Sequence, residues 1–230
     1  MGFQRARTEE QRNERRRQIL GAAAEMLTEV PVAELTLTAL SRRVCLAKAN
    51  VLRYFESREA VLLELLEAEI ADWLAVLEDV ELPEGGSAEE RATGLAELLA
   101  TSLAGRPVLC ELVSTQSTVL ERNISTPTAI RHKRTVLGHL AKVVGFATRY
   151  LPELGDEAAG ALVETTLLMV IAAWPSSRPP QAVRDAYAAD PTLAVTCVDF
   201  AAVVRRTVEV TAVGLLAKAK VVPAREIPAR

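Results

Sequence analysis

The segment from residue 36 to residue 58 constrains the fold of this chain more than any other. Its apolar residues form two stripes with helical spacing, separated by a break in register at Leu46. The first stripe consists of Leu37, Leu40 and Val44, and the second consists of Val51, Leu52 and Phe55. Two short helices joined by a turn of three or four residues have the spacing of a helix-turn-helix motif.

The second of these helices leaves donor and small side chains outside its apolar stripe, with no carboxylate among them. These residues are Lys48, Ala49, Asn50, Arg53 and Tyr54. Such a face can lie against the phosphates and base edges of DNA. A helical core segment chosen at random would more often carry mixed charge there, so this composition indicates DNA binding.

Three runs in this region carry a family resemblance: ILGAAAEML, LTLTALSRRV and LAKANVLRYFESREAVLLELL. The most diagnostic part is LRYFESREA. Over about 60 residues the chain resembles the DNA-binding domain of the tetracycline-repressor (TetR) family of bacterial transcriptional regulators. The resemblance implies an all-α protein, with an N-terminal three-helix helix-turn-helix domain at 1–58 and a larger helical ligand-binding and dimerisation domain at 59–230.

Two positions depart from the family pattern. The turn position that the family usually gives to glycine is Cys45, where a positive φ would strain a residue with a Cβ atom. The usual serine cap of the recognition helix is Ala47, which gives up a cap worth about 1 kcal/mol. Neither change removes a DNA-facing group, so we expect them to affect local stability more than DNA binding.

The resemblance also implies which residues contact DNA. Thr36 and Thr38 would offer hydroxyl and backbone N–H groups to a phosphate at the start of the first of the two helices. Lys48 and Tyr54 match positions that touch the backbone or groove edges, and Arg58 matches a basic phosphate clamp.

Asn50 and Arg53 are the candidates for reading bases, because Asn suits adenine and Arg suits guanine. The alternative is that Asn50 is only solvated and Arg53 contacts phosphate alone. The run Arg15, Arg16 and Arg17 is a further phosphate candidate if it lies at the start of the first helix, where the helix dipole disfavours cations. A solvated charged face is the alternative for that run.

Charge and composition agree with this division. Residues 1–58 contain 11 Lys and Arg against 7 Asp and Glu, a net charge of +4, whereas residues 59–230 contain 16 against 23, a net charge of −7. Only the first part is therefore expected to meet a polyanion. Arginine outnumbers lysine throughout, which base composition alone could produce. Half of the residues are hydrophobic and 4% are aromatic, with no lasting strand alternation, which favours an all-helical chain.

Caps and breaks predict the order of the remaining helices. Residues 1–11 are expected to form a polar arm, Ser57 to cap a long helix, and Ser87 with Glu90 to form a capping box. Thr126 and Asp156 are expected to cap two later helices. The predicted helices lie near residues 12–30, 58–80, 88–104, 107–123, 127–150, 157–174 and 193–220. The last two long helices are apolar on more than one side and must be covered on both. The family pairs such helices across a two-fold homodimer.

The body is expected to hold a small, mostly hydrophobic effector. The candidates are aromatic, soft or polar residues on apolar stretches, each with ordinary core packing as the alternative: Trp73, Cys110, Gln116, His139, Phe146, Thr166, Met169 and Trp174. His132 and His139 lie seven apart on one predicted helix, but without further ligands at suitable spacing neither a metal nor another cofactor is expected.

Other classes of protein fit this sequence less well than a DNA-binding regulator does. No nucleophile elbow, phosphate loop or metal motif appears, so an enzyme is not expected. The longest apolar run, Leu167 to Trp174, is too short to span a bilayer, and the N-terminus lacks the apolar core of a signal peptide, so we expect a cytoplasmic protein. The sequence therefore predicts a ligand-responsive regulator, most simply a repressor that binds a palindromic double-stranded DNA operator. The alternative is an architectural or activator protein that binds DNA without a ligand.

Overall fold

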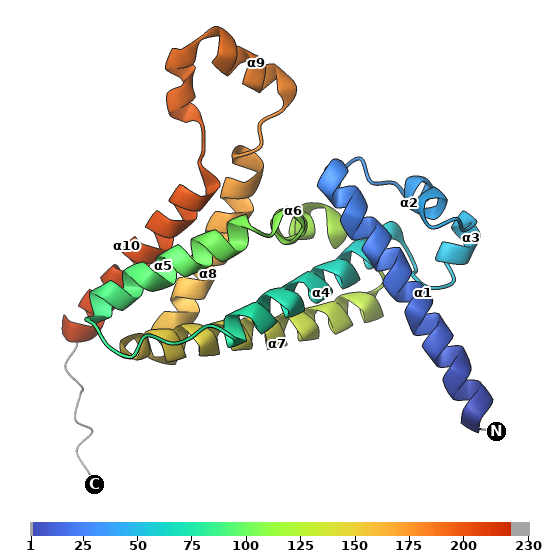
Figure 1. Cartoon of the computed structure of the whole chain (residues 1–230), viewed down its shortest axis with the longest axis horizontal. Coiled ribbons are helices and arrows are strands. Elements are labelled where there is room, and N and C mark those ends of the chain that lie inside the picture. The colour runs from blue at the N-terminus through green and yellow to red at the C-terminus, as the bar shows by residue number, and fades with distance from the viewer. Residues whose placement is uncertain (1, 222–230) are drawn as a thin grey trace. The chain divides into compact units, whose positions relative to one another are not determined.

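The computed structural model describes the backbone of residues 2–221 and the side chains of residues 9–219. All regular elements in this part of the chain are helices (Figure 1), which confirms the all-α prediction. The α-helices are α1 (Gly2–Glu29), α2 (Leu37–Arg43), α3 (Lys48–Val51), α4 (Arg58–Glu78), α5 (Ala88–Ala104), α6 (Pro107–Thr115), α7 (Thr126–Tyr150), α8 (Gly155–Ser176), α9 (Gln181–Ala189) and α10 (Phe200–Val221). A π-helical turn, η1, spans Gln116–Leu120, and 3₁₀ turns η2 and η3 span Pro152–Leu154 and Pro191–Thr196.

The chain divides into two compact units. Unit 1 comprises Met1–Trp73 and Arg106–Gly138, and unit 2 comprises Leu74–Gly105 and His139–Arg230. The unit boundaries fall inside α4 and α7, so each of these two helices contributes residues to both units.

Unit 1 is built around α1, which packs against α2 and α6. Ile19 and Ala23 of α1, Leu40 of α2 and Val51 of α3 are completely buried, as the apolar spacing predicts. Leu52 differs from its prediction, because 42% of its surface is exposed. α3 forms only one helical turn, and the chain bends after Val51, so the expected stripe does not continue through Leu52.

The turn between α2 and α3 contains the strained position that the sequence predicts. Cys45 has φ of 52°, and no other described residue apart from glycine has a positive φ. Its N–H donates to the carbonyl of Arg42 at 3.1 Å, and the N–H of Leu46 donates to the carbonyl of Ser41 at 2.9 Å. These two bonds form a Schellman motif, which needs a left-handed residue at this point. The hydrogen bonds that end α2 therefore place a Cβ atom where glycine is preferred.

Replacing Cys45 with glycine is expected to stabilise the protein by about 1 kcal/mol, since the left-handed strain is removed and part of the gain is offset by backbone entropy. The melting temperature should rise by roughly 2–4 °C for a chain of this size. Thermal unfolding followed by circular dichroism measures the effect. Cys45→Ala is the control, because it removes the thiol but keeps the Cβ atom. An equal rise in both variants would contradict the strain argument.

Two of the predicted caps are confirmed. The Ser57 hydroxyl accepts from the N–H of Ala60 at 3.1 Å as α4 begins. Ser87 and Glu90 form the full capping box of α5, with the Glu90 carboxylate accepting from the Ser87 N–H at 2.7 Å. These hydrogen bonds also lower the pKa of the exposed Glu90 carboxyl. Ala47, as expected, provides no side-chain cap for α3.

Other predicted helix ends were wrong. The N-terminal residues do not form an arm, because α1 already begins at Gly2. The polar residues that suggested an arm, mainly Arg, Gln and Glu, are good helix formers. Ser125, rather than Thr126, caps α7: the Ser125 carbonyl accepts from the Ala129 N–H at 2.9 Å.

The ends of the last two long helices also differ from the prediction. α8 begins at Gly155 with Asp156 inside its first turn, and it ends at Ser176 with Pro175 inside its last turn. α10 begins only at Phe200, because Pro191–Thr196 forms a 3₁₀ turn instead of a first helical turn. Pro175 has no N–H to donate to the Ile171 carbonyl, so α8 lacks that helical hydrogen bond and ends one residue later.

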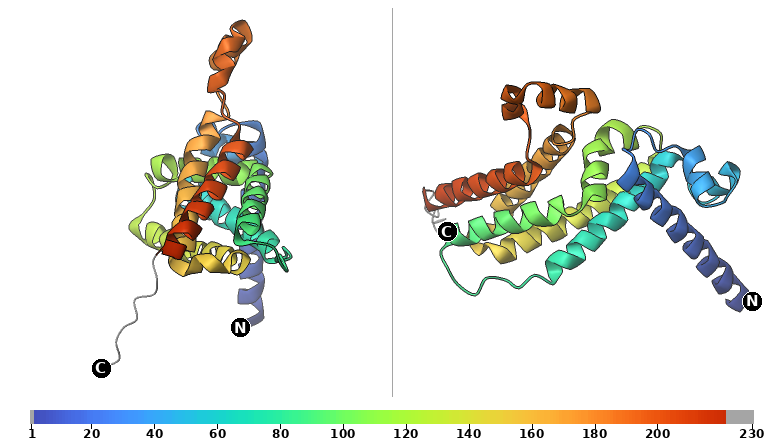
Figure 2. Two further views of the ribbon diagram at one scale, coloured as in Figure 1. Left: turned by 90° about the vertical axis from the view of Figure 1, so that its left-hand side faces the viewer. Right: turned by 45° about the horizontal axis from the view of Figure 1, so that its top comes forward.

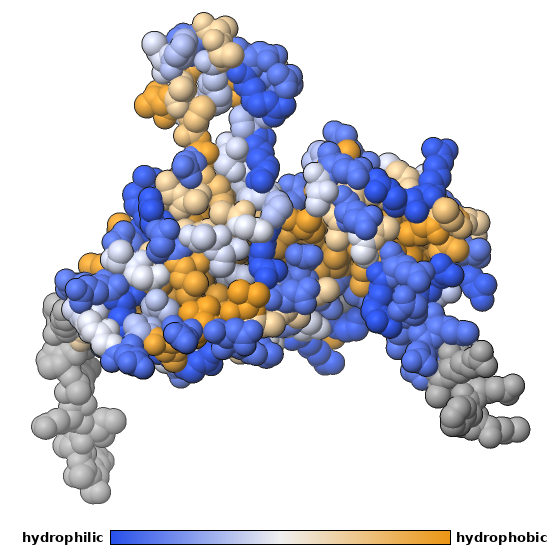
Figure 3. Space-filling view, viewed as in Figure 1, coloured by the Kyte–Doolittle hydropathy of each residue, from blue (hydrophilic) through white to orange (hydrophobic). Residues whose placement is uncertain are grey.

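In unit 2, α10 packs along both α5 and α8. Buried residues of the three helices make this core: Leu95 and Leu99 of α5, Leu162 of α8, and Val204 and Val208 of α10. α9 and η3 project from these helices and pack on each other, and neither contains a buried residue (Figures 1 and 2). Figure 3 shows apolar side chains on the surface of this projection. Leu193 and Val195 of η3 are among the exposed large apolar residues.

Within the described residues, the stretch Pro152–Ser176 is long and apolar enough to cross a membrane by length and composition alone. This stretch is longer than the apolar run Leu167 to Trp174 noted in the sequence, because flanking alanines and glycine extend that run. The core helix of a soluble protein can meet the same criterion, and α8 packs against α10.

Candidate functional site

The face predicted to meet DNA is exposed in the structure. Lys48 and Asn50 lie on α3, and Arg53 lies in the turn that follows; all three are exposed. Tyr54 is half-buried beside them. The single turn of α3 thus presents two of the predicted residues, whereas Arg53 is placed by the bend after it.

A polar hollow of about 360 Å³ lies beside this face in unit 1. It is lined by Gln11 and Arg12 of α1 together with Arg53 and Tyr54. Among the described side chains, neither guanidinium has an ion pair or hydrogen bond, and no carboxylate lines the hollow. Two uncompensated guanidinium groups around one hollow can hold phosphate or a guanine edge. Gln11 and Arg12 were not predicted to contact DNA, because residues 1–11 were expected to form an arm and Arg12 belonged to no predicted site.

The two predicted threonines lie at the start of α2, and both are exposed. Thr36 is the N-cap, and its hydroxyl accepts from the N–H of Ala39 at 3.1 Å. That hydroxyl can still donate its own proton to a phosphate. Thr38 lies in the first turn, where backbone N–H groups face outward.

Arg58 lies in a different setting from the other predicted contacts. Its guanidinium donates to the Leu35 carbonyl at 2.9 Å and pairs with the Glu59 carboxylate at 3.0 Å. It also reaches the Val32 carbonyl at 3.4 Å, and its side chain is mostly buried. This geometry favours a structural role, in which Arg58 ties the start of α4 to the loop between α1 and α2.

The arginine run does not occupy a helix start, so the electrostatic reason for proposing phosphate there is lost. Arg16 points inward: its guanidinium bonds to the Glu64 carboxylate and the Tyr54 carbonyl, and lies 4.3 Å from the ring centroid of Phe55. Arg15 and Arg17 instead bond to neighbours on α1. The three adjacent arginines therefore separate into one packed residue and two surface residues.

A carboxylate joins the end of the helix-turn-helix segment to the start of α7. Glu56 accepts hydrogen bonds from both the N–H and the hydroxyl of Ser125, each at 2.8 Å. The backbone bond, followed by the hydroxyl bond, lowers the pKa of the Glu56 carboxyl. Glu56 is thus held ionised at neutral pH at the junction that follows the DNA-facing residues.

The predicted effector residues are divided between the two units. Trp73, Cys110 and Gln116 belong to unit 1, and His139, Phe146, Thr166, Met169 and Trp174 belong to unit 2. Cys110 and Phe146 are buried, and Trp174 packs edge-on against Phe200 with ring centroids 5.1 Å apart. Thr166 donates to the carbonyl of its own helix at Leu162. Phe146 lines a hollow within unit 2.

A buried polar cluster in unit 1 was not predicted. His132 is 1% exposed, and its Nδ1 lies 2.7 Å from Oε1 of Glu67 on α4. Its Nε2 lies 3.1 Å from the amide nitrogen of Gln116, which also donates to Glu121 at 2.8 Å. Because the amide donates, Nε2 of His132 accepts and its Nδ1–H donates to Glu67. Gln116 is therefore already engaged in joining α4, η1 and α7.

Lys133 completes this cluster at the surface. Burial raises the pKa of the Glu121 carboxyl, but hydrogen bonds from Lys133 and Gln116 outweigh it, and the resulting pKa lies below the ordinary value. No described group of three or more His, Cys, Asp or Glu residues is arranged to hold a metal ion. No sequence pattern indicated the cluster, since His132 and Glu67 are 65 residues apart.

The exposed donor face and its three-helix support define a helix-turn-helix DNA-binding protein with a helical body. Comparison with known families agrees: residues 19–65 match the family described as bacterial regulatory proteins, tetR family. Residues 67–219 match the tetracyclin repressor-like C-terminal domain. The chain belongs to the TetR family of transcriptional regulators.

Solved structures show the same fold at low sequence identity. A possible TetR family regulator from Streptomyces coelicolor A3(2) is 18% identical, with a TM-score of 0.57 over 88% of this chain and 99% of that one. A TetR regulator from Rhodococcus sp. RHA1 is 18% identical, with a TM-score of 0.55 over 88% and 97%. The regulator FadR from Bacillus subtilis, solved with stearoyl-CoA, is 16% identical, with a TM-score of 0.52 over 86% and 97%. None of the curated proteins compared with this chain matches it.

Proposed function

We propose that this TetR-family regulator is a ligand-responsive repressor that binds a palindromic operator as a homodimer. The observation that carries the proposal is the exposed face of Lys48, Asn50 and Arg53 beside the hollow that Arg12 shares. This face offers cations and amide groups without a carboxylate, which suits phosphates and base edges. In this proposal, residues 1–58 bind DNA and residues 59–230 bind the effector and dimerise, in the cytoplasm.

Release from the operator would follow from a population shift between two spacings of the DNA-binding heads, one of which matches half-sites about 34 Å apart. α4 suits this role, because it begins directly after the DNA-facing segment and continues into unit 2. A small, mostly hydrophobic effector that binds one spacing better than the other would move this equilibrium.

Fluorescence anisotropy tests the proposal on the DNA flanking the protein's own gene, beside scrambled DNA, at two salt concentrations. Repression by this mechanism predicts tight, selective and salt-dependent binding that an effector weakens. Selective binding that no compound in a ligand screen alters would favour the ligand-independent activator or architectural protein. Equal, weak binding to both DNAs, and to sequences enriched from a random pool, would contradict the operator proposal.

The homodimer in this proposal uses α8 and α10. These helices expose large apolar residues on the surface of unit 2: Leu168 of α8 is 59% exposed, and Val210 and Val213 of α10 are 67% and 38% exposed. Several such residues on two packed helices are more than the isolated exposed residue that a soluble monomer tolerates. Gly160 and Gly214 leave open space on the same helices for close approach of another helix.

Val210→Glu is therefore expected to shift the protein from dimer to monomer, because a carboxylate would be buried in an apolar interface. Sedimentation velocity at several protein concentrations measures the shift, and operator affinity should fall with it. Leu137→Glu is the control, since Leu137 is equally exposed but lies on α7. A dimer unchanged by Val210→Glu would exclude this part of α10 from the interface.

A further inference from the structure

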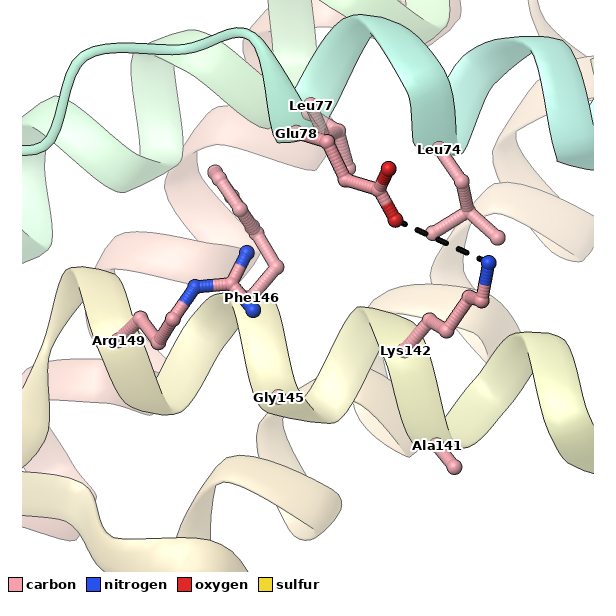
Figure 4. A pocket seen from close by; sticks show the side chains of 8 residues that line it. All are labelled: Leu74, Leu77, Glu78, Ala141, Lys142, Gly145, Phe146 and Arg149. Atoms are coloured by element: carbon pink, nitrogen blue, oxygen red, sulfur yellow. Dashed lines mark ion pairs between the residues drawn. The ribbon is translucent and has the colours of Figure 1, made fainter.

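A second hollow, of about 270 Å³, lies within unit 2 between the C-terminal part of α4 and the C-terminal half of α7 (Figure 4). Leu74 and Leu77 of α4 and Phe146 of α7 form its apolar floor. Lys142 and Arg149 of α7 stand on its rim. Its volume is slightly below the roughly 300–1,000 Å³ of ordinary ligand pockets, so only a small molecule fits.

The space is left open by a glycine on α7. Gly145 lies in the interior of a 25-residue helix, where glycine costs about 1 kcal/mol relative to alanine. A Cβ atom added there would meet no heavy atom within 4 Å. Packing within the chain therefore does not require glycine at this position, and the space above the apolar floor remains available to a ligand.

The rim carries two cations, Lys142 and Arg149, and one carboxylate, Glu78. Arg149 is exposed and has no ion pair or hydrogen bond among the described residues. Lys142 lies 3.8 Å from the Glu78 carboxylate, beyond hydrogen-bond distance, and both side chains are more than half exposed. Such an exposed ion pair contributes little to the stability of the fold, so Lys142 is able to pair with another anion instead. Lys142, Phe146 and Arg149 follow one another at helical steps of four and three and therefore share a face of α7.

We propose that this groove binds a small amphiphilic carboxylate, such as a medium-chain fatty acid anion. Its alkyl chain would lie over Gly145 on the apolar floor, and its carboxylate would accept hydrogen bonds from Arg149, with Lys142 as a second cation. The floor residues are almost fully buried and offer little apolar area, so contact with the alkyl chain alone gives weak binding. Binding of the ligand therefore requires its carboxylate as well. A role for this molecule as the effector rests on the proposed regulatory function.

Calorimetric titration with octanoate tests the groove, with octanol and octylamine as neutral and cationic analogues. Octanoate should bind the wild-type protein, and the two analogues should bind at least about tenfold more weakly. Gly145→Leu should abolish binding because its side chain fills the space. Arg149→Gln should weaken binding about tenfold by removing the charged donor.

The matched controls are Gly138→Leu and Arg134→Gln, which change exposed residues of α7 outside the groove. Both should bind octanoate as the wild type does, and melting curves should show that all four variants fold. Absence of octanoate binding, equal binding of octanol, or binding unaffected by Gly145→Leu would each overturn the assignment.

Operator binding measured in the same samples tests the regulatory function independently of ligand binding in the groove. Selective DNA binding without octanoate binding would refute the groove and leave the regulator intact. Octanoate binding without selective DNA binding would confirm the groove and refute the regulator. If octanoate binds and releases the operator, and Gly145→Leu abolishes both effects, the groove is the effector site.

Discussion

Arg16→Met is expected to lower the free energy of unfolding by about 2–3 kcal/mol, one of the two largest effects foreseen here. Methionine keeps most of the aliphatic packing but leaves the Glu64 carboxylate and the Tyr54 carbonyl without their donor. It also removes the cation above the Phe55 ring. Since the Arg16 side chain is three-quarters buried, water replaces these interactions only in part. Chemical denaturation monitored by circular dichroism measures the loss.

Arg17→Met is the matched control from the same run of arginines. The Arg17 side chain is 71% exposed and pairs only with Glu14 on its own helix, so its replacement should change stability by no more than about 0.5 kcal/mol. If Arg16 instead contacted phosphate, Arg16→Met would leave the unfolding free energy unchanged and weaken DNA binding. That result would reverse the structural assignment.

The features that the sequence predicted well are those decided by neighbouring residues. Helical stripes follow from steps of three and four, and they correctly indicated the burial of Leu40 and Val51. The capping box at Ser87 and the left-handed turn at Cys45 likewise depend on a few adjacent residues. Helix boundaries were predicted less well: Asp156 lies inside the first turn of α8 instead of capping it, and Pro191–Thr196 forms the 3₁₀ turn η3 instead of the first turn of the last helix.

The roles of charged side chains could not be predicted in the same way. Arg16 and Arg58 carry the same guanidinium group as Arg53, but their partners come from elsewhere in the chain. Glu64 is 48 residues from Arg16, and the Leu35 carbonyl is 23 residues from Arg58. Spacing along one helix gives no information about such partners. Only the folded chain separates the arginines that support the head from those left free to meet DNA.

The groove in unit 2 was missed for a related reason. The residue types expected in an effector pocket, aromatic, soft or polar on apolar stretches, include Phe146 but not the other residues around the groove. The space depends on a missing side chain at Gly145 and on α4 lying beside α7. A glycine within a helical pattern indicates a local weakness in the helix, and only its neighbours in the fold show that it borders a hollow.

The second large effect is expected from Arg53→Ala, which should reduce discrimination between operator and scrambled DNA about tenfold to a hundredfold per half-site. Arg53 is exposed in the turn after α3 and has no described partner within the chain, so its removal should leave the melting temperature unchanged. A bidentate contact with guanine is lost only on the cognate sequence, because scrambled DNA does not place that base edge in register. Anisotropy titrations on both DNAs measure the ratio directly.

Arg12→Ala provides the contrast across the same hollow. Arg12 comes from α1 and not from the predicted recognition helix, so we expect it to contact phosphate. Its loss should weaken binding to both DNAs equally and reduce the salt slope by about one per half-site. If Arg53→Ala also weakens binding to both DNAs equally, Arg53 contacts phosphate alone, and Asn50 is the remaining candidate for reading bases. If Arg53→Ala changes the affinity for neither DNA, the hollow lies outside the DNA interface, because a free guanidinium at a DNA surface always contributes counterion release.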